Sequence, residues 1–342
     1  MKMQAAFWYG PERLEIEEVD VPQIGPDEVL VKIGVALTCG TDFKLFRKGH
    51  ALLVKDIPSP FGHELAGTIV EAGAHVTRFK TGDQVVAANS APCGTCFFCE
   101  KEQWNLCENL EFLNGAYAEY IRIPAQIVRK NLYKIPSHLS FKEAALTEPL
   151  ACVLHCMDRI GVKPYETLCI LGAGTCGLLF VQLANLYGTQ PIVVGRGKEK
   201  LEVAKKLGAK HTVSILDPEF KDKIKNLTSR YGPDTVVDAI GKPETWQLAV
   251  ELVRKGGRVW FYGGCVSGSN VSLDTHRLHY DEITCSGIFH HTPAHFSRAL
   301  QLIASRKINV AELIRGEVRL NDLHQIFQKG NLDNPMKMAV IP

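Results

Sequence analysis

The chain has 342 residues, of which 46% are hydrophobic and 22% charged, and its formal net charge is +2. This length predicts two domains, each large enough for its own hydrophobic core. The small net charge, with no block of like charges, argues against a nucleic-acid partner. We find no apolar run long enough to span a bilayer and no signal peptide, so no membrane partner is expected. Eleven cysteines then predict a reducing, cytoplasmic compartment and favour metal ligation over disulfides.

The first third of the chain has the pattern of short strands separated by turns. Residues 28–35 are rich in β-branched side chains, and further strand patterns occur at 68–71 and 84–88. Gly73 and residues 81–83 mark turns between them. We expect no helix of useful length before about residue 140. This part of the chain is therefore predicted to be an all-β lobe, a partly open barrel.

Two short motifs in this lobe carry candidate metal ligands. Cys39 opens the sequence Cys-Gly-Thr-Asp, and His63 and Glu64 lie in Gly-His-Glu-Leu-Ala-Gly. A single cysteine is commonly a small core residue, and a single histidine is commonly a hydrogen-bonded polar residue. The residue types alone leave both readings open, and the presence of the two motifs in one lobe favours metal binding.

Four cysteines follow within fifteen residues, at a spacing of C-x2-C-x2-C-x7-C: Cys93, Cys96, Cys99 and Cys107. A set of four thiolates is typical of a tetrahedral structural zinc site. An iron–sulfur cluster is the main alternative, but the long gap before the last cysteine and the absence of Cys-Pro disfavour it; disulfides are a further alternative. A closed four-sulfur cage has no open coordination position, so it can stabilise a lobe at 90–110 but cannot carry out chemistry.

Glu148 is a third candidate ligand outside the cysteine cluster. It precedes Pro149 inside an apolar stretch, where a carboxylate is poorly solvated and requires a cation or hydrogen-bond donors. The alternative is that Glu148 caps the helix that Pro149 can start.

From about residue 151 the pattern changes to alternating strands and helices. A buried-strand run at 167–171 leads into Gly172-Ala-Gly-Thr-Cys-Gly, and an apolar-periodic helix follows at 178–187. In this context Gly172 makes the tight turn, Gly174 lets the backbone approach a pyrophosphate, and Gly177 lets the helix pack on the strand. The N-terminus of the helix attracts the phosphates. These features predict a dinucleotide-binding fold.

The next strand, 192–194, ends without the acidic residue that commonly binds the ribose of NAD. Gly195 and Arg196 stand there instead. Without the carboxylate a 2′-phosphate is not repelled, and Arg196 can bind it with two hydrogen bonds. The sequence therefore favours NADP(H) over NAD(H). The alternative is that Arg196 and Lys198 are solvated surface charges.

Further strands at 235–241, 257–264 and 282–287, with a helix at 293–305, are predicted to complete a doubly wound parallel sheet. A last strand at 336–341 is expected to return to the first lobe. We therefore predict a discontinuous first domain, 1–150 with 291–342, and a dinucleotide-binding domain, 151–290.

The order of these motifs over essentially the whole chain resembles the zinc-containing medium-chain dehydrogenase/reductase family. Glu148-Pro-Leu, where classical alcohol dehydrogenases carry a cysteine ligand, resembles the polyol dehydrogenase branch. The resemblance implies an α/β fold with a GroES-like, mostly-β catalytic domain and a Rossmann domain. It also implies two zinc ions per chain. Cys39, His63 and either Glu64 or Glu148 would hold the catalytic zinc, and the four clustered cysteines the structural one.

The resemblance further implies hydride transfer between a secondary alcohol, of the polyol, sugar-alcohol or sugar-acid type, and a nicotinamide. The expected catalytic residues are Thr41, His63 and Glu64, with Thr41 taking the proton of the substrate hydroxyl. Many relatives carry histidine three residues beyond this threonine, whereas this chain has Lys44, so the proton would leave through water, the cofactor ribose or His50. The expected cofactor-binding residues are Gly172, Gly174, Thr175, Cys176, Gly177, Arg196, Lys200, Ile240, Gly263 and Lys337. His290 and His291 are candidates for contact with cofactor phosphate or substrate.

Family members are commonly dimers or tetramers, so a homodimer or homotetramer is expected, with the apolar strand Val259–Tyr262 near the sheet edge pairing across a two-fold axis. Two other functions stay open. One is a simple secondary-alcohol dehydrogenase or ketone reductase. The other is a non-catalytic zinc and dinucleotide sensor, which the open metal site formed by Cys39 and His63 disfavours.

Overall fold

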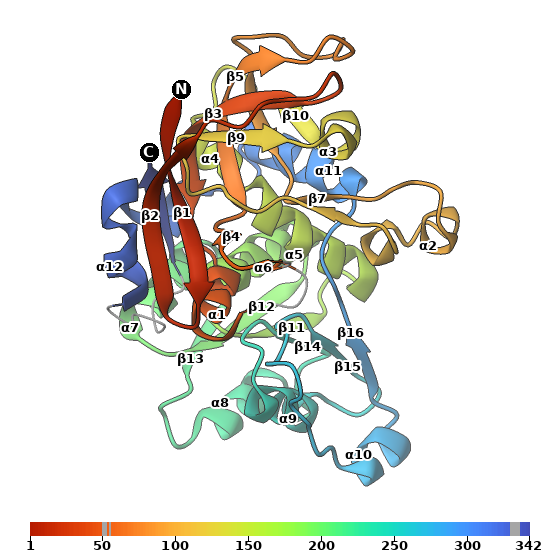
Figure 1. The fold of residues 1–342 in the computed structure, drawn as a ribbon. Coiled ribbons are helices and arrows are strands. Elements are labelled where there is room, and N and C mark those ends of the chain that lie inside the picture. The colour runs from red at the N-terminus through yellow and green to blue at the C-terminus, as the bar shows by residue number, and fades with distance from the viewer. Residues whose placement is uncertain (50–52, 55, 329–335) are drawn as a thin grey trace. The chain divides into compact units, whose positions relative to one another are not determined.

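The computed structural model describes residues 1–49, 53–54, 56–328 and 336–342. The chain divides into two compact units, and the division falls within helix α5, Thr147–Ile160. Figure 1 labels this helix and the other elements. Unit 1 comprises Met1–Ala151, His291–Arg306 and Val310–Pro342, and unit 2 comprises Cys152–His290 and Lys307–Asn309.

Unit 1 is built on a seven-stranded sheet with the order β10-β6-β5-β3-β18-β17, and β9 also pairs with β3. Most pairings are antiparallel, and only β17 and β18 run parallel. A smaller sheet has the order β2-β1-β4. The strands are β1 (Lys2–Gly10), β2 (Arg13–Asp20), β3 (Val29–Leu37), β4 (Ser59–Pro60), β5 (Glu64–Ala72), β6 (Gln84–Ala87), β9 (Tyr120–Ile123), β10 (Leu132–Lys134), β17 (Ile314–Arg319) and β18 (Lys337–Ile341).

The central pair of this sheet, β3 and β5, is fixed in register by close backbone contact. A side chain at Gly67 on β5 would come within 2.2 Å of the carbonyl oxygen of Lys32 on β3, so only glycine fits there. The inward-facing side chains of both strands join one core, which also contains Phe61, Tyr117 and Phe327. The strand β18, from the far end of the chain, completes this sheet beside β3.

The helices of unit 1 differ from the expectation in one respect. The prediction of no helix of useful length before about residue 140 is wrong, because α1 spans the nine residues Gly40–Lys48. A shorter helix, α3, spans Ala125–Lys130. A capping box at its N-terminus and the burial of Leu45 and Phe46 stabilise α1 despite its glycine and threonine. The other helices of this unit are α2 (Phe97–Glu100), α4 (Phe141–Ala145), α11 (Pro293–Ala304) and α12 (Leu323–Gln328).

The helix α11 belongs to unit 1, in agreement with the predicted domain boundary at residue 291, although the strand–helix pattern suggested that it completes the parallel sheet. Its packing explains its place in unit 1. The ring of Phe296 stacks on that of Tyr133, with centroids 5.6 Å apart, and the carbonyl oxygen of Ala304 contacts His138 Nε2 at 2.9 Å. Both partners lie in unit 1.

Unit 2 contains a six-stranded parallel sheet with the order β13-β12-β11-β14-β15-β16. The strands are β11 (Thr167–Leu171), β12 (Gln190–Gly195), β13 (His211–Ser214), β14 (Thr235–Asp238), β15 (Arg258–Phe261) and β16 (Thr284–Gly287). The helices are α6 (Thr175–Leu186), α7 (Lys198–Lys206), α8 (Phe220–Leu227), α9 (Pro243–Leu252) and α10 (Thr275–Tyr280). The chain winds outward from β11 in one direction and then from β14 in the other. The switch point between them is where such sheets bind ligands.

The expectation that the strand Val259–Tyr262 pairs across a two-fold axis is wrong. β15 is hydrogen-bonded to β14 on one side and to β16 on the other, so its backbone groups are already paired. In the described sheet, the edge strands are β13 and β16.

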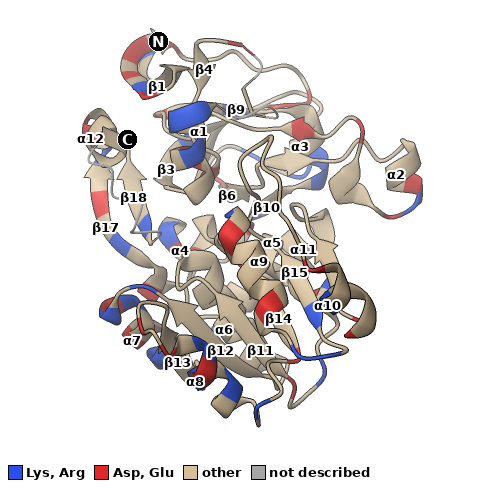
Figure 2. Ribbon diagram, turned by 90° about the horizontal axis from the view of Figure 1, so that it is seen from below, with Lys and Arg blue, Asp and Glu red and all other residues tan. Residues whose placement is uncertain are grey.

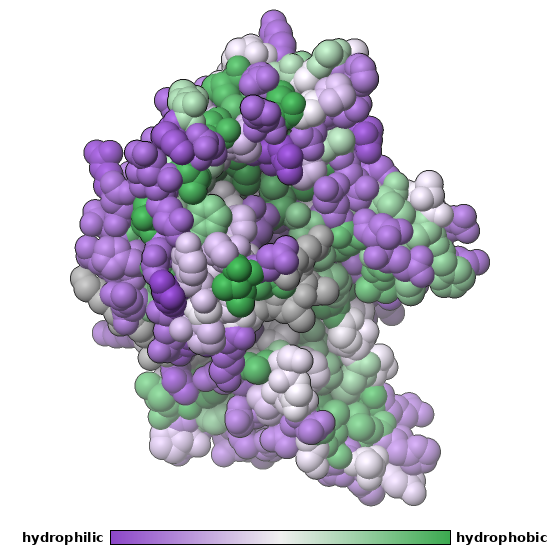
Figure 3. Space-filling model, in the orientation of Figure 1, coloured by the Kyte–Doolittle hydropathy of each residue, from purple (hydrophilic) through white to green (hydrophobic). Residues whose placement is uncertain are grey.

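The surface has a basic region and an apolar region. Basic side chains gather along α7, which carries Lys198, Lys200, Lys205 and Lys206 (Figure 2). The segment around α2 carries the exposed apolar side chains Phe97, Trp104 and Leu106, and apolar surface is visible there in Figure 3. None of the helices in the described ranges is both long and apolar enough to cross a bilayer.

Candidate active site

Strand pairing in unit 1 brings the scattered candidate ligands together. Leu37, the last residue of β3, pairs with Glu64, the first residue of β5. Cys39 follows β3 and His63 precedes β5, so both lie at the same end of this strand pair. One donor atom from each of Cys39, His63 and Glu64 lies within 4.8 Å of the others. His63 and Glu64 are almost completely buried, and Cys39 is half-buried.

The charged neighbours in this group favour a thiolate at Cys39. Burial alone would raise the pKa of the Cys39 thiol, but the positive charge of Lys337 and the His63 imidazole lower the pKa to about 7. A thiolate, the form that binds metal ions, is therefore accessible near neutral pH. For His63, burial acts to lower the pKa, but the Asp42 carboxylate and Cys39 raise it well above its ordinary value.

Asp42, which was not among the predicted site residues, contacts His63. Its Oδ1 atom lies 2.9 Å from His63 Nδ1. Its Oδ2 atom accepts hydrogen bonds from the backbone N–H of Cys39 at 2.8 Å and from the hydroxyl of Tyr117 at 2.5 Å. Asp42 is completely buried. Its place in the Cys-Gly-Thr-Asp motif was the sequence signal, but only the fold reveals that it contacts His63.

Lys337 meets Glu64 in the interior. β18 pairs with β3 through Ala339 and Leu37, which brings the start of β18 to the same end of the sheet. The Lys337 ammonium donates to both Glu64 oxygens, at 2.5 and 2.7 Å, and both side chains are buried. Burial raises the pKa of Glu64 well above its ordinary value even though the Lys337 charge opposes this shift. The sequence singled out both residues, but as a cofactor contact and a metal ligand rather than as a pair.

Glu148 lies in a second buried polar cluster of unit 1, with two residues that are distant in sequence. Asn89 Nδ2 donates to Glu148 Oε1 at 3.0 Å, and Asn89 Oδ1 lies 3.2 Å from His291 Nε2. All three residues are buried. Asn89 was not predicted from the sequence. Within the described chain, Glu148 is not part of the close donor group formed by Cys39, His63 and Glu64.

The residues expected to move a proton lie next to this donor group in sequence. Thr41 is the second residue of α1 and is half-buried. Lys44, one turn further along α1, is exposed. His50, one of the groups through which the proton was expected to leave, lies outside the described residues.

The four clustered cysteines converge, as their spacing predicts. The Sγ atoms of Cys93 and Cys107 are 3.4 Å apart, those of Cys96 and Cys107 3.7 Å, and those of Cys93 and Cys99 4.0 Å. A zinc ion bound by four sulfurs at about 2.3 Å requires sulfur separations of about 3.8 Å. The geometry therefore fits a tetrahedral zinc site. The backbone N–H groups of Cys93 and Gly94 also donate to two of these sulfur atoms, those of Cys107 and Cys99.

The glycine loop of unit 2 has the close packing that its sequence predicts. Gly172 has φ = +113°, and its missing side chain leaves room for Ile240. A side chain at Gly177 would come within 1.9 Å of the Gly172 carbonyl oxygen. Gly174 caps helix α6, so the first N–H groups of that helix face the loop without a capping side chain. Thr175 and Cys176 form the first turn of α6, and Cys176 Sγ accepts a hydrogen bond from Tyr262 at 3.3 Å.

The end of β12 has no room for an acidic side chain at its last residue. A side chain at Gly195 would come within 2.8 Å of Ala173 Cβ in the glycine loop. Arg196 follows and is exposed, and Lys200 in α7 is half-buried. At the ends of β14 and β15, a side chain at Gly263 would come within 2.4 Å of the Gly241 nitrogen. Close packing therefore excludes a side chain at Gly195 and at Gly263, and Arg196 presents an exposed basic side chain directly after the first of them.

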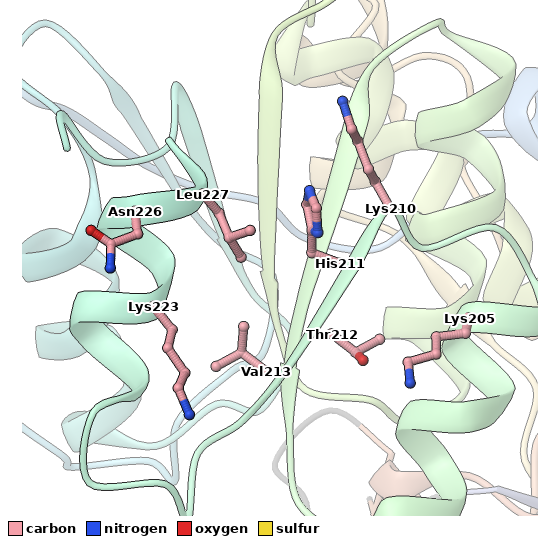
Figure 4. Close-up of a pocket in the computed structure, with 8 residues that line it drawn as sticks. All are labelled: Lys205, Lys210, His211, Thr212, Val213, Lys223, Asn226 and Leu227. Carbon is pink, nitrogen blue, oxygen red and sulfur yellow. The ribbon is translucent and has the colours of Figure 1, made fainter. Parts of the chain in front are cut away.

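A pocket of about 540 Å³ lies elsewhere in unit 2, beside the edge strand β13 (Figure 4). It is lined by Lys205, Lys210, His211, Thr212, Val213, Lys223, Asn226 and Leu227, none of which is a predicted site residue. Its lysines already have partners, since Lys205 pairs with Glu202 and Lys210 with Gln190. We therefore do not regard this pocket as the active site.

Comparisons with known proteins match both units. A family model described as "Alcohol dehydrogenase GroES-like domain" matches residues 25–137, and one described as "Zinc-binding dehydrogenase" matches residues 175–305. The chain is 31% identical over 334 residues to a sorbitol dehydrogenase of Bacillus subtilis, covering 96% of this chain and 93% of that protein. It is 30% identical to a D-arabitol-phosphate dehydrogenase of Enterococcus avium, covering 97% and 94%.

A solved structure agrees with these matches. It is a putative zinc-binding dehydrogenase from Sinorhizobium meliloti bound to NADP, with a TM-score of 0.88, 31% identity and complete coverage of both chains. The similarity in sequence and the similarity in fold therefore extend over the same whole length.

Proposed function

This chain belongs to the zinc-containing medium-chain dehydrogenase/reductase family, in its polyol dehydrogenase branch. We therefore propose that it acts on a sugar alcohol or a sugar-alcohol phosphate. It is an oxidoreductase that transfers a hydride between a secondary alcohol and a nicotinamide cofactor. The relatives named for sorbitol and arabitol phosphate support the substrate class. The observation that carries the proposal is the buried donor group of Cys39, His63 and Glu64.

We propose that Cys39, His63 and one of Glu64 and Glu148 hold a catalytic zinc ion. A thiolate, an imidazole and a carboxylate form a donor set that suits zinc and leaves a position for the substrate. When bound there, the metal would act as a Lewis acid on the substrate oxygen. The four clustered cysteines would hold a second, structural zinc ion. The donor chemistry of the buried group supports the first assignment, and the sulfur separations support the second.

The residues around the donor group have separate roles in this proposal. Asp42 holds the His63 ring through Nδ1, so Nε2 is left for the metal. The Lys337 ammonium balances the charge of Glu64 in the buried site. Thr41 accepts the proton of the substrate hydroxyl on Oγ1 and passes it outward through water or the cofactor ribose, since Lys44 stands where relatives carry histidine.

We propose that unit 2 binds NADP(H) in preference to NAD(H). The pyrophosphate would lie on the glycine loop and the N-terminus of α6, which Gly172, Gly174 and Gly177 keep open. Thr175 and Cys176 belong to the same turn, and Ile240 and Gly263 border it from the next strands. Arg196 and Lys200 would bind the 2′-phosphate, which Gly195 does not repel. The NADP-bound relative supports this choice.

For assembly, we propose a homodimer or homotetramer. Because β15 is paired on both sides, any extension of the parallel sheet across subunits has to use β13 or β16. The molecular mass in solution tests this proposal. A mass near the 37.9 kDa of one chain would exclude it.

The experiment that tests the proposed function is a dehydrogenase screen of the zinc-loaded protein. Polyols, sugar acids and sugar-alcohol phosphates are offered with each nicotinamide, and simple secondary alcohols serve as the comparison. We expect reduction of the nicotinamide with at least one polyol or its phosphate, and a lower KM for NADP+ than for NAD+. Turnover only with simple secondary alcohols would replace the polyol proposal with the alternative of a simple alcohol dehydrogenase.

A further inference from the structure

We infer that Tyr117 is a positioning residue for the catalytic metal site, acting on His63 through Asp42. This inference rests on the proposed function, because it assumes that Cys39 and His63 hold the metal ion. Tyr117 lies 54 positions after His63 in the chain, beyond the cysteine cluster. Neither the sequence motifs nor the comparisons assign it a role.

Two hydrogen bonds and one close contact with an imidazole meet on the Asp42 carboxylate. Oδ2 accepts from the Tyr117 hydroxyl at 2.5 Å and from the Cys39 N–H at 2.8 Å, and Oδ1 lies 2.9 Å from His63 Nδ1. A carboxylate that accepts two hydrogen bonds on one oxygen cannot rotate without breaking them. Its other oxygen therefore has a fixed direction, toward the imidazole.

This arrangement determines which nitrogen of His63 faces Asp42. Nδ1 lies 2.9 Å from Oδ1 of the carboxylate. Nε2, the other ring nitrogen, is then left for a metal ion. Tyr117 contributes one of the two hydrogen bonds that hold the carboxylate in this orientation, so it acts on the metal ligand without touching it.

Tyr117 is itself held rigidly, as a positioning residue has to be. It is 1% exposed and is among the largest fully buried side chains. Its backbone N–H donates to Phe61 at 2.9 Å, and its carbonyl accepts from Ala6 at 2.8 Å. Gly62, with φ = +89°, has no side chain, and a Cβ there would lie 2.7 Å from the Tyr117 ring. Gly62, the residue before His63, thus leaves the space that the Tyr117 ring fills.

Replacing tyrosine by phenylalanine at position 117 distinguishes a positioning role from simple packing. Phenylalanine fills the same space as tyrosine, so a Tyr117→Phe variant keeps the ring contacts with Phe61 and Gly62. It removes only the hydroxyl, which also lies 3.2 Å from the carbonyl of Leu37. A packing role therefore predicts little change, and a positioning role predicts a looser His63. Loss of such an outer partner commonly costs 10- to 100-fold in metal affinity or activity.

The test compares zinc release and kinetics in the full-length zinc enzyme, as wild type and as Tyr117→Phe. Zinc transfer to a chromogenic chelator is followed in time, together with kcat and the KM for each substrate. We expect one of two zinc ions to leave about 10-fold or more faster from the variant, with the other unchanged. We expect kcat to fall while the KM for the nicotinamide stays the same. Tyr133→Phe is the matched control, because the Tyr133 hydroxyl donates to the backbone carbonyls of Lys130 and Pro293, each at 3.3 Å.

A second variant keeps the inference testable if Tyr117→Phe fails to fold. Asp42→Asn preserves shape but weakens the same chain of contacts, so it should release the same zinc ion faster. In the double variant the two effects should not add, because both act through one carboxylate. Equal zinc release and equal kcat in wild type and Tyr117→Phe would overturn the inference alone. A wild-type chain that binds zinc only at the four cysteines would overturn the proposed function, and this inference with it.

Discussion

At the scale of single residues, the candidate active site contains more buried charge than an ordinary protein interior. Glu64 and Lys337 are almost completely inaccessible, and Asp42 and His63 are buried beside them. Buried charges are expensive unless they are paired, so each of these residues depends on its neighbours. Removing one partner of a buried pair should therefore lower the free energy of unfolding more than removing one partner of a surface pair.

Replacement of Lys337 by methionine tests this dependence. The change leaves the Glu64 carboxylate buried without its ammonium partner, and we expect a loss of about 3–5 kcal/mol in the free energy of unfolding of the metal-free protein. Urea denaturation measures it. Lys142→Met is the control, because the Lys142–Glu317 pair is exposed and should contribute about 0–1 kcal/mol. The double variant Lys337→Met, Glu64→Gln should recover part of the loss. Equal effects of Lys337→Met and Lys142→Met would contradict the account.

At the scale of elements, the parallel sheet of unit 2 is tied together at the start of its central strands. Asp234, just before β14, accepts hydrogen bonds from the backbone N–H and the hydroxyl of Thr167 on β11, both at 2.7 Å. The Arg254 side chain donates to its other oxygen at 2.7 Å. Burial acts to raise the pKa of Asp234, but these donors and the Arg254 charge outweigh it and lower the pKa below its ordinary value.

This shift predicts a pH dependence of stability. A carboxylate whose pKa is lowered by folding contributes stability that is complete above its unfolded pKa, about 3.9, and is lost as the pH falls through the folded value. We therefore expect the wild type to lose more unfolding free energy than Asp234→Asn between pH 7 and pH 3. Urea denaturation at a series of pH values measures the difference. Parallel curves for the two proteins would show that Asp234 is not the group responsible.

The preference for NADP(H) is tested at the junction of β12 and α7. Arg196 is exposed directly after β12, next to Gly195, where Ala173 leaves no room for a side chain. We expect Arg196→Ala to raise the KM for NADP+ about 10-fold or more, since a charge-assisted bidentate contact contributes about 1.5–3 kcal/mol, and to leave the KM for NAD+ nearly unchanged. Steady-state kinetics with both cofactors measure this. Lys198→Ala, on the same exposed segment, is the control. Equal changes for both cofactors would exclude the 2′-phosphate role.

At the scale of the whole molecule, the sequence predicted the α/β class, the zinc dehydrogenase family and the polyol branch, and the comparisons confirm them. Glycines and clustered cysteines made this possible, because their spacing is fixed by local backbone geometry. The features that were missed depend on contacts between distant segments. Asn89 meets His291 across 202 positions, and Lys337 meets Glu64 across 273. Local patterns carry no signal for such pairs.

Two errors have the same origin. α1 was missed because glycine and threonine at its start are weak helix formers, and its capping box and its burial in the core compensate for them. β15 was taken as lying near the sheet edge because an apolar strand resembles any buried strand, and only the order of strands shows that β16 lies outside it. Individual site roles stay predictions, since they depend on a metal ion and a cofactor held by residues from many elements.

The central claim is that the donor group of Cys39, His63 and Glu64 carries the chemistry, whereas the four-cysteine lobe supports the fold. The most direct measurement is the zinc content per chain together with turnover, for Cys39→Ser and for Cys107→Ser. We predict that Cys39→Ser loses one of two zinc ions and nearly all turnover while its urea unfolding midpoint stays near that of the wild type. Cys107→Ser should lose the other zinc ion and unfold at lower urea, with activity falling only as the fold is lost. Wild-type turnover in Cys39→Ser would contradict the claim.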